Sequence, residues 1–157
     1  MTFTIEPVRN ATDLKVAARL FCEYAEDLGE DLCFQGFEQE LATLPGCYAP
    51  PEGDIFLAKL ADGTPAGCVA FRPMADVAIC EMKRMYVPPA GRGQGIGRAL
   101  VKKVLAAARA AGYHIMRLDT LPRLEAALHL YADAGFSQTS AYYQNPLPGV
   151  VYLQKQL

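Results

Sequence analysis

The feature that most constrains the fold is a glycine-rich segment, AGRGQGIGRALV (residues 90–101), which joins an apolar strand pattern to a helix pattern. Its four glycines occupy alternate positions from 91 to 97. Glycine weakens a helix, so several of them at a helix start indicate that the backbone needs unusual φ angles or close approach by another group. Because the first N–H groups of a helix are unpaired and the helix dipole attracts anions, we predict a phosphate-binding loop here.

Two common phosphate-binding motifs do not fit this segment. The dinucleotide fingerprint G-x-G-x-x-G fails from each starting glycine, because Ile96, Arg98 or Leu100 stands at the third glycine position. The nucleoside triphosphate loop G-x-x-x-x-G-K-[ST] fails because no two glycines have that spacing before Lys and Ser or Thr. The sequence therefore predicts a different phosphate ligand.

Hydrophobic periodicity predicts the elements around the loop. The expected strands are residues 3–8, 54–60, 65–73, 78–87 and 115–120, with a closing antiparallel pair in 136–144 and 150–156. The expected helices are residues 13–28, 37–44 and 96–111, and a fourth from Pro122 to before Gly135. No repeat or linker divides the chain. We expect one α/β domain over residues 1–157, built on an α+β mixed sheet with helices on both faces.

The strand before the loop, EMKRMYV (residues 81–87), has an irregular pattern in which strict alternation leaves neither face apolar. One extra residue at Lys83-Arg84, a β-bulge, would turn Met82, Met85 and Val87 toward the core. Such a bulge bends this strand away from its parallel neighbour at 115–120. We therefore predict a V-shaped gap with unpaired backbone groups between the two strands.

Charge is unevenly distributed along the chain, whose formal net charge is −2. Residues 81–123 hold nine basic and two acidic side chains, whereas residues 1–80 hold five basic and thirteen acidic ones. A cationic centre in an acidic protein suits a discrete polyanionic ligand, and a nucleic-acid partner is not expected. No secretion signal or membrane-length apolar stretch is present, so we expect a cytoplasmic protein without a membrane partner.

The cysteines and histidines predict no metal centre. No two of the five cysteines have C-x-x-C spacing, so reduced thiols are expected, with Cys68 and Cys80 in the core. Cys22 would be reactive only if exposed beside a base. His114 and His129 are expected to be structural or surface residues.

The glycine segment fits R-x-x-G-x-G and resembles motif A of the GNAT superfamily of acyl-coenzyme A N-acyltransferases, Q/R-x-x-G-x-G/A. The stretch EMKRMYVPPAGRGQGIGRALV is similar to the family's strand, loop and helix. LDTLP is similar to the end of its next strand, and ALHLYADAGF to its later L-Y-x-x-x-G-F block. The resemblance implies a GNAT-like fold of six to seven strands, splayed between strands 4 and 5. It also implies an N-acetyltransferase that uses acetyl-CoA and no metal.

The resemblance further implies how coenzyme A binds. Its pantetheine arm fills the gap through strand-like hydrogen bonds to the main chain of Met85, Tyr86 and Val87. The pyrophosphate lies on the loop formed by Arg92, Gly93, Gln94, Gly95, Ile96, Gly97 and Arg98. Many relatives have an asparagine after the fifth strand, whereas this chain has Asp119-Thr120, so that side-chain contact is not carried over.

Acyl transfer to an amine needs a neutral amine, a stabilised oxyanion and a proton for the departing thiolate. Glu81 matches the family's catalytic glutamate, which implies a general base; the alternatives are a salt bridge with Lys83 or Arg84, and a base made of water alone. Tyr131 matches the tyrosine that protonates the coenzyme A sulfur; the alternative is a core tyrosine. Because the chain lacks a Cys/His nucleophile arrangement, we expect direct transfer in a ternary complex.

The acceptor is an amine of a small molecule or a protein. The acidic stretch EYAEDLGED (residues 23–31) matches a loop that often walls the family's acceptor site, and it would favour a cationic amine. Gln35, Tyr48 and Tyr142 are further lining candidates. The alternative function is a non-catalytic coenzyme A-binding sensor, but the presence of both Glu81 and Tyr131 favours the enzyme. The family also leads us to expect a homodimer through the C-terminal strands.

Overall fold

A mixed sheet of seven strands forms the centre of the computed structural model, which describes residues 2–32 and 35–157. The strands are β1 (Phe3–Pro7), β2 (Asp54–Leu60), β3 (Pro65–Pro73), β4 (Ile79–Tyr86), β5 (Ile115–Thr120), β6 (Ser137–Gln138) and β7 (Val151–Gln156). Their order across the sheet is β1-β2-β3-β4-β5-β7-β6. Only β4 and β5 pair in parallel; the other neighbours are antiparallel. The predicted mixed sheet is confirmed.

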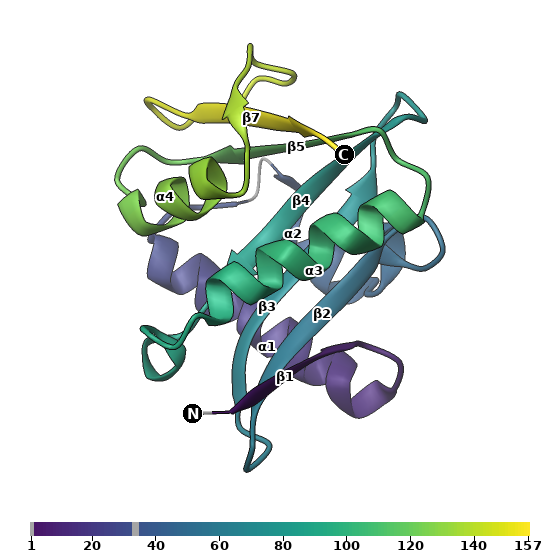
Figure 1. The fold of residues 1–157 in the computed structure, drawn as a ribbon, viewed down its shortest axis with the longest axis vertical. Helices are drawn as coiled ribbons and strands as arrows, with labels where there is room; N and C mark the ends of the chain where they lie inside the picture. The colour runs from purple at the N-terminus through teal and green to yellow at the C-terminus, as the bar shows by residue number, and fades with distance from the viewer. Residues whose placement is uncertain (1, 33–34) are drawn as a thin grey trace.

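Helices cover both faces of this sheet, as predicted (Figure 1). They are α1 (Ala11–Leu28), α2 (Phe37–Ala42), α3 (Ile96–Ala110) and α4 (Glu125–Asp133), with short 3-10 turns η2 (Gly46–Tyr48) and η3 (Pro89–Gly91). α1 lies behind the sheet in Figure 1 and α3 crosses its front. Within the described part of the chain, no helix combines the length and the apolar character needed to cross a membrane.

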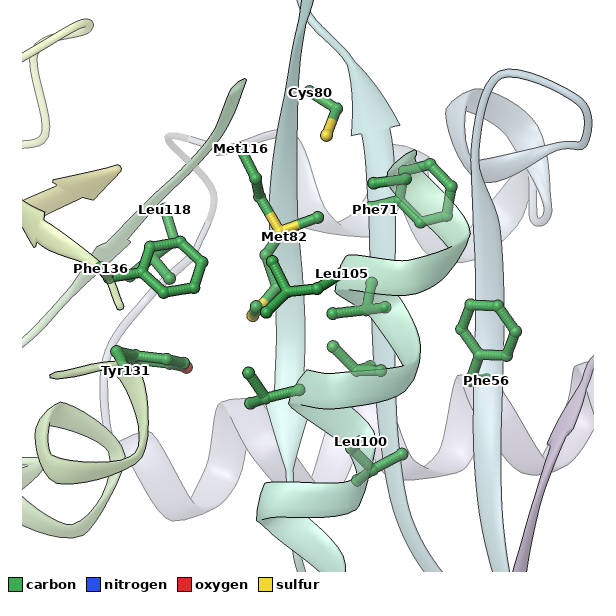
Figure 2. Packing of buried hydrophobic residues seen from close by; sticks show 14 of the residues in the cluster. Phe56, Phe71, Cys80, Met82, Leu100, Leu105, Met116, Leu118, Tyr131 and Phe136 are labelled. Carbon is green, nitrogen blue, oxygen red and sulfur yellow. The ribbon is translucent and has the colours of Figure 1, made fainter. Parts of the chain in front are cut away.

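Each face of the sheet has its own hydrophobic core. Behind the sheet, Phe21 of α1 packs with Leu57 and Tyr48. In front, Leu100 and other apolar residues of α3 pack on Met82 of β4 and its neighbours (Figure 2). Cys68 and Cys80 are fully buried in these two cores, as predicted, because they lie in apolar strands.

Two predicted boundaries differ from the structure by more than two residues, and the others agree within two. The strand expected at residues 136–144 contains only the two residues of β6. Tyr142 and Tyr143 leave the sheet because their hydroxyls donate to buried carboxylates, and their rings pack at a tilt of 47° with 5.4 Å between centroids. The fourth helix begins at Glu125 rather than at Pro122 because a turn comes first, closed by the Leu124 N–H, which donates to the Leu121 carbonyl.

The predicted β-bulge is confirmed in β4. Ala70 of β3 pairs with Lys83, but Cys68, two residues earlier, pairs with Tyr86, so β4 holds one extra residue. Arg84 has φ = 60°, the one positive value among the described non-glycine residues. The extra residue turns Met82, Met85 and Val87 to the α3 side, as expected.

The bulge separates β4 from β5. Their pairing consists of Ile79–Ile115, Cys80–Met116 and Glu81–Arg117 and then stops. Beyond these residues the two strands diverge toward the start of α3, which Figure 1 shows as a widening angle between β4 and the nearly horizontal β5. The V-shaped splay is therefore present between strands 4 and 5.

A buried ion pair holds the bulge in place. Arg84 donates from Nε and Nη2 to the two carboxylate oxygens of Glu40 on α2, at 2.8 and 2.9 Å. Both side chains are buried. A positive φ costs a non-glycine residue about 1–2 kcal/mol. The bidentate contact offsets this cost and fixes α2 against the bulge.

Replacing Glu40 by alanine tests this anchor. The change leaves the buried guanidinium of Arg84 without its carboxylate, and breaking a buried ion pair costs about 3–5 kcal/mol. We expect the free energy of unfolding, measured with urea, to fall by about 3 kcal/mol. The control is Glu38→Ala, which removes an exposed acid from the same helix and should change it by less than about 0.5 kcal/mol. Equal losses in the two variants would contradict the anchoring role.

Candidate active site

The space between β4 and β5 is a narrow cavity of about 60 Å³, called the splay cavity below. Its walls come from α1, the bulge, the end of β5, and α4. The lining residues include Tyr24, Leu28, Lys83, Arg84, Met85, Asp119, Leu121, Ala127, Tyr131 and Asn145. Apolar and polar side chains both line this cavity, and the polar ones include Lys83, Arg84, Asp119 and Asn145.

The glycine loop stands at the start of α3, next to the open end of the splay. Gly93 and Gly95 both have φ = +80°, which other residues rarely adopt. Gly95 caps α3 without a side-chain hydrogen bond, so the first turn of the helix lacks a side-chain cap. A Cβ atom on Gly97 would lie 2.8 Å from Leu130 Cδ1, so glycine permits α3 to approach α4 closely. The loop therefore has the geometry that the sequence predicted for a phosphate site.

Arg92 and Arg98 are exposed and paired with acids. Arg92 donates from Nε to the Val87 carbonyl at 3.0 Å, and its Nη2 lies 3.4 Å from Asp27. Arg98 contacts Asp133 at 3.0 Å. Exposed ion pairs of this kind are worth little, so both guanidinium groups are available to a stronger anion.

Tyr131 of α4 lines the splay cavity and is 6% exposed. Its ring packs edge-on against Phe136, with 5.8 Å between the ring centroids (Figure 2). Burial raises the pKa of the Tyr131 hydroxyl, and the negative charge of Asp119 acts in the same direction. The hydroxyl therefore keeps its proton at neutral pH and has a proton to donate.

Glu81 is buried and fully engaged. Its Oε1 accepts from Nε of Arg72 at 3.0 Å and forms an ion pair with Nη2 at 2.9 Å, and its Oε2 accepts from the Tyr142 hydroxyl at 2.6 Å. Of the two salt bridges considered from the sequence, Lys83 lies 4.0 Å from Oε2, whereas Arg84 binds Glu40 instead. Glu81 faces a second cavity and does not line the splay cavity.

This second cavity, called the Arg72 cavity below, has a volume of about 370 Å³. Its lining residues are Gln35, Cys47, Arg72, Pro73, Met74, Ala75, Glu81, Lys83, Tyr142 and Tyr143. Gln35 and Lys83 line both cavities. These two side chains therefore form the partition between the cavities.

Hydrogen bonds hold the partition together. Gln35 Oε1 accepts from Lys83 Nζ at 3.1 Å, and Gln35 Nε2 donates to the Tyr143 hydroxyl at 3.3 Å. That hydroxyl donates to Asp119, which also lies 3.6 Å from Lys83 Nζ. Burial lowers the pKa of Lys83, although Glu81 and Asp119 act in the opposite direction. An ammonium group here therefore loses its proton more easily than one in water.

Several residues that line the two cavities were not predicted from the sequence. Arg72 stands near the end of an apolar strand, and its charge there was the one available signal. Lys83 was considered at the bulge and as a partner of Glu81, but not as a residue that lines a cavity. Asn145 reaches the splay cavity from the segment before β7 and donates to Asp119 at 2.8 Å. An asparagine amide thus lies beside the strand-5 residue that departs from the family pattern.

Only some of the residues expected to line the acceptor site line a cavity in the structure. Gln35 and Tyr142 line the Arg72 cavity, but Tyr48 is fully buried against Phe21 in the core behind the sheet. Within the acidic stretch, Asp27 pairs with Arg92 and Glu30 lies 3.6 Å from Arg123. These two acids therefore neutralise arginines outside both cavities.

The histidines lie outside both cavities, and of the described cysteines only Cys47 lines one of them, the Arg72 cavity. His114 and His129 are exposed, as predicted. Four cysteines are free thiols, with Cys22 half-buried and Cys47 exposed; Cys33 lies outside the described residues. Across residues 2–32 and 35–157, no three His, Cys, Asp or Glu side chains gather in a way that would hold a metal ion.

The chain has clear relatives. The profile of the Acetyltransferase (GNAT) family matches residues 17–136. An uncharacterised N-acetyltransferase of Schizosaccharomyces pombe is 41% identical over 154 residues, which cover 98% of this chain and 94% of that protein. Human N-acetylaspartate synthetase is 34% identical over 111 residues, which cover 71% of this chain and 37% of that enzyme.

Solved structures agree with this fold. A GNAT-family acetyltransferase from Staphylococcus aureus has a TM-score of 0.80 at 16% identity, with 99% of each chain covered. A proposed acetyltransferase from Salmonella typhimurium, solved with its cofactor acetyl-CoA, has a TM-score of 0.74 at 19% identity and covers 99% of this chain and 94% of its own. At these identities the likeness supports the fold, and the family match supports the activity, since GNAT acetyltransferases use acetyl-CoA. The chain therefore belongs to the GNAT acetyltransferase family and is an N-acetyltransferase.

Proposed function

We propose that this chain, as a single domain, moves an acetyl group from acetyl-CoA directly to a primary amine, with the donor between β4 and β5. The observation that carries the proposal is the splay, which begins after Glu81 and opens toward the glycine loop of α3. A ligand with an extended arm and a pyrophosphate fits this combination. The arm would add to the free edge of β4 while the pyrophosphate lies on the helix start.

The donor site consists of main-chain groups and two arginines. Met85, Tyr86 and Val87 would hydrogen-bond the pantetheine arm; the Val87 carbonyl already accepts from Arg92 but has a second lone pair. Residues 92–98 would hold the pyrophosphate with amides that lack a side-chain cap. Arg92 and Arg98 would exchange their weak bonds to surface acids for the phosphates.

In the reaction, the amine nitrogen attacks the thioester carbon, a C–N bond forms, and the C–S bond breaks. The amine must lose one proton, and the departing thiolate must gain one. Tyr131 would give its proton to the sulfur, because its buried hydroxyl stays protonated and lines the splay cavity. Glu81 would act as the base through Tyr142. The Tyr142 hydroxyl would pass its own proton to Glu81 Oε2, 2.6 Å away, and would take up the proton of the amine in its place.

The acceptor does not follow from the relatives, because their names point to different substrates: one is an N-acetylaspartate synthetase and another an IAA acetyltransferase. A homodimer through the C-terminal strands and a cytoplasmic location stay predictions from the sequence. Calorimetry with acetyl-CoA, followed by a panel of amines and an assay for free thiol, tests the proposed function. Failure to bind acetyl-CoA would contradict it.

The loop is tested by Arg92→Ala. Removing a cation that contacts phosphate should weaken acetyl-CoA binding about tenfold, as measured by calorimetry at low salt. Lys102→Ala is the control, because it removes an equal charge from the exposed side of the same helix. If both variants lost the same affinity, the general charge of α3 rather than the loop would hold the donor.

The acid role is tested by Tyr131→Phe. This change removes the proton donor but keeps the ring, so kcat should fall at least about a hundredfold while the Kd for acetyl-CoA changes less than about threefold. Tyr113→Phe is the control: Tyr113 is also buried, but its hydroxyl donates to the Glu52 carbonyl, away from both cavities. Full activity of the Tyr131 variant would remove the acid role.

The base role is tested by Glu81→Gln. The amide still has an oxygen for Arg72 but takes no proton, so kcat/KM at neutral pH should fall about a hundredfold. The loss should shrink as pH rises toward about 10, where an amine deprotonates without help. A variant whose pH profile runs parallel to that of the wild type would show that Glu81 acts only on structure. Glu125→Gln, on α4, is the control for loss of an exposed carboxylate.

A further inference from the structure

We propose that the Arg72 cavity binds the acceptor and selects a small primary amine that also carries a carboxylate, with amino acids as the simplest members of this class. The inference rests on the proposed function, in which acetyl-CoA occupies the splay cavity. The Arg72 cavity lies on the other side of the partition formed by Gln35 and Lys83. An acceptor in the Arg72 cavity would therefore reach acetyl-CoA at the partition, next to the point where β4 and β5 separate.

The guanidinium of Arg72 is the group that recognises the carboxylate. Glu81 Oε1 accepts from its Nε at 3.0 Å and lies 2.9 Å from its Nη2, and these contacts restrict the plane of the guanidinium. Among the described residues, the recorded partner of Nη1 is the Cys47 sulfur at 4.0 Å, which is a weak acceptor. Arg72 thus offers oriented N–H donors to the cavity without an oxygen acceptor in place. A carboxylate matches this planar set of donors.

The charges of the wall favour an anion over a cation. Arg72 and Lys83 are basic, and Glu81 is the one acidic lining residue among the parts of the chain described. Both oxygens of Glu81 are taken, one by Arg72 and the other by Tyr142. An acceptor with several ammonium groups would therefore meet the permanent positive charge of Arg72 and a carboxylate that is already engaged.

The acidic stretch does not change this balance. Asp27 and Glu30 contact arginines outside the cavity and do not line it. These two acids therefore do not support the cationic acceptor that the sequence suggested. The charged group that faces the cavity from β3, Arg72, has the opposite sign.

The arrangement also orients the acceptor. Lys83 and Gln35 lie on the side shared with the splay cavity, so the amine belongs there and the carboxylate belongs at Arg72. A cation near the amine favours its neutral, nucleophilic form. A volume of about 370 Å³ suits a small molecule. Pro73, Met74 and the ring of Tyr143 leave an apolar wall for a hydrophobic side chain.

Matched acceptor pairs test this selection. Calorimetry first establishes acetyl-CoA binding, and thiol release is then measured with L-phenylalanine against phenethylamine, L-leucine against isoamylamine, and spermidine as a polycation. We expect kcat/KM for at least one amino acid to exceed that of its decarboxylated partner by about tenfold or more. An equal or better rate with the amine or with spermidine would overturn the inference. So would acetyl-CoA binding without turnover of either amino acid. Absent acetyl-CoA binding would instead overturn the proposed function.

The variants Arg72→Gln and Arg72→Lys identify the residue responsible. Because Arg72 also touches Glu81, the readout is the ratio of kcat/KM for the amino acid to that for its amine, in which a general effect on catalysis cancels. Arg72→Gln should lower this ratio about tenfold or more, and Arg72→Lys should keep part of it. A ratio unchanged in Arg72→Gln would overturn the role of Arg72. Unaltered acetyl-CoA affinity and unfolding by urea confirm that the variants are folded.

Discussion

The ion pair between Arg84 and Glu40 is the contact on which the rest of the site depends. It holds a residue with positive φ inside β4, and the extra residue ends the pairing with β5 after Glu81. Without this bulge the two strands would continue side by side, and the sheet would have no internal edge to offer a ligand. The same bulge turns Lys83 and Arg84 behind the sheet while the methionines stay in the front core. One local irregularity therefore creates both the cleft and its polar floor.

The buried charges behind the sheet form a connected group rather than isolated pairs. Arg72, Glu81, Tyr142 and Lys83 are linked to Asp119 and Tyr143 through contacts of at most 4.0 Å. Because charges in a low-dielectric interior need partners, each member restricts the orientation of the next. This group separates a narrow cavity that suits an extended thioester arm from a wider one that suits a small acceptor. The proposed chemistry takes place at the partition between them.

Much of the fold could be predicted because it depends on local patterns. The glycine loop, the helix after it and the β-bulge follow from backbone needs and alternation that a short stretch reveals. The closing strands were predicted less well, since Tyr142 and Tyr143 carry a strand-like composition but are drawn away by hydrogen bonds to carboxylates far off in sequence. Tyr48 was also expected at the acceptor site, but it packs against Phe21 of α1 in the core behind the sheet, a contact between segments far apart in sequence.

The sequence by itself determined the glycine loop, the splayed strand and the family, because each depends on neighbouring residues: glycines at a helix start, an extra residue in a strand, and ordered motifs. Only the tertiary structure decided which charges meet. Arg72 comes to Glu81 from an adjacent strand, Glu40 to Arg84 from α2, and Asp27 and Glu30 to surface arginines. Side-chain pairing across elements depends on distances that no local pattern encodes. For that reason the glycine loop and the splay could be foreseen, whereas the charged lining of the Arg72 cavity could not.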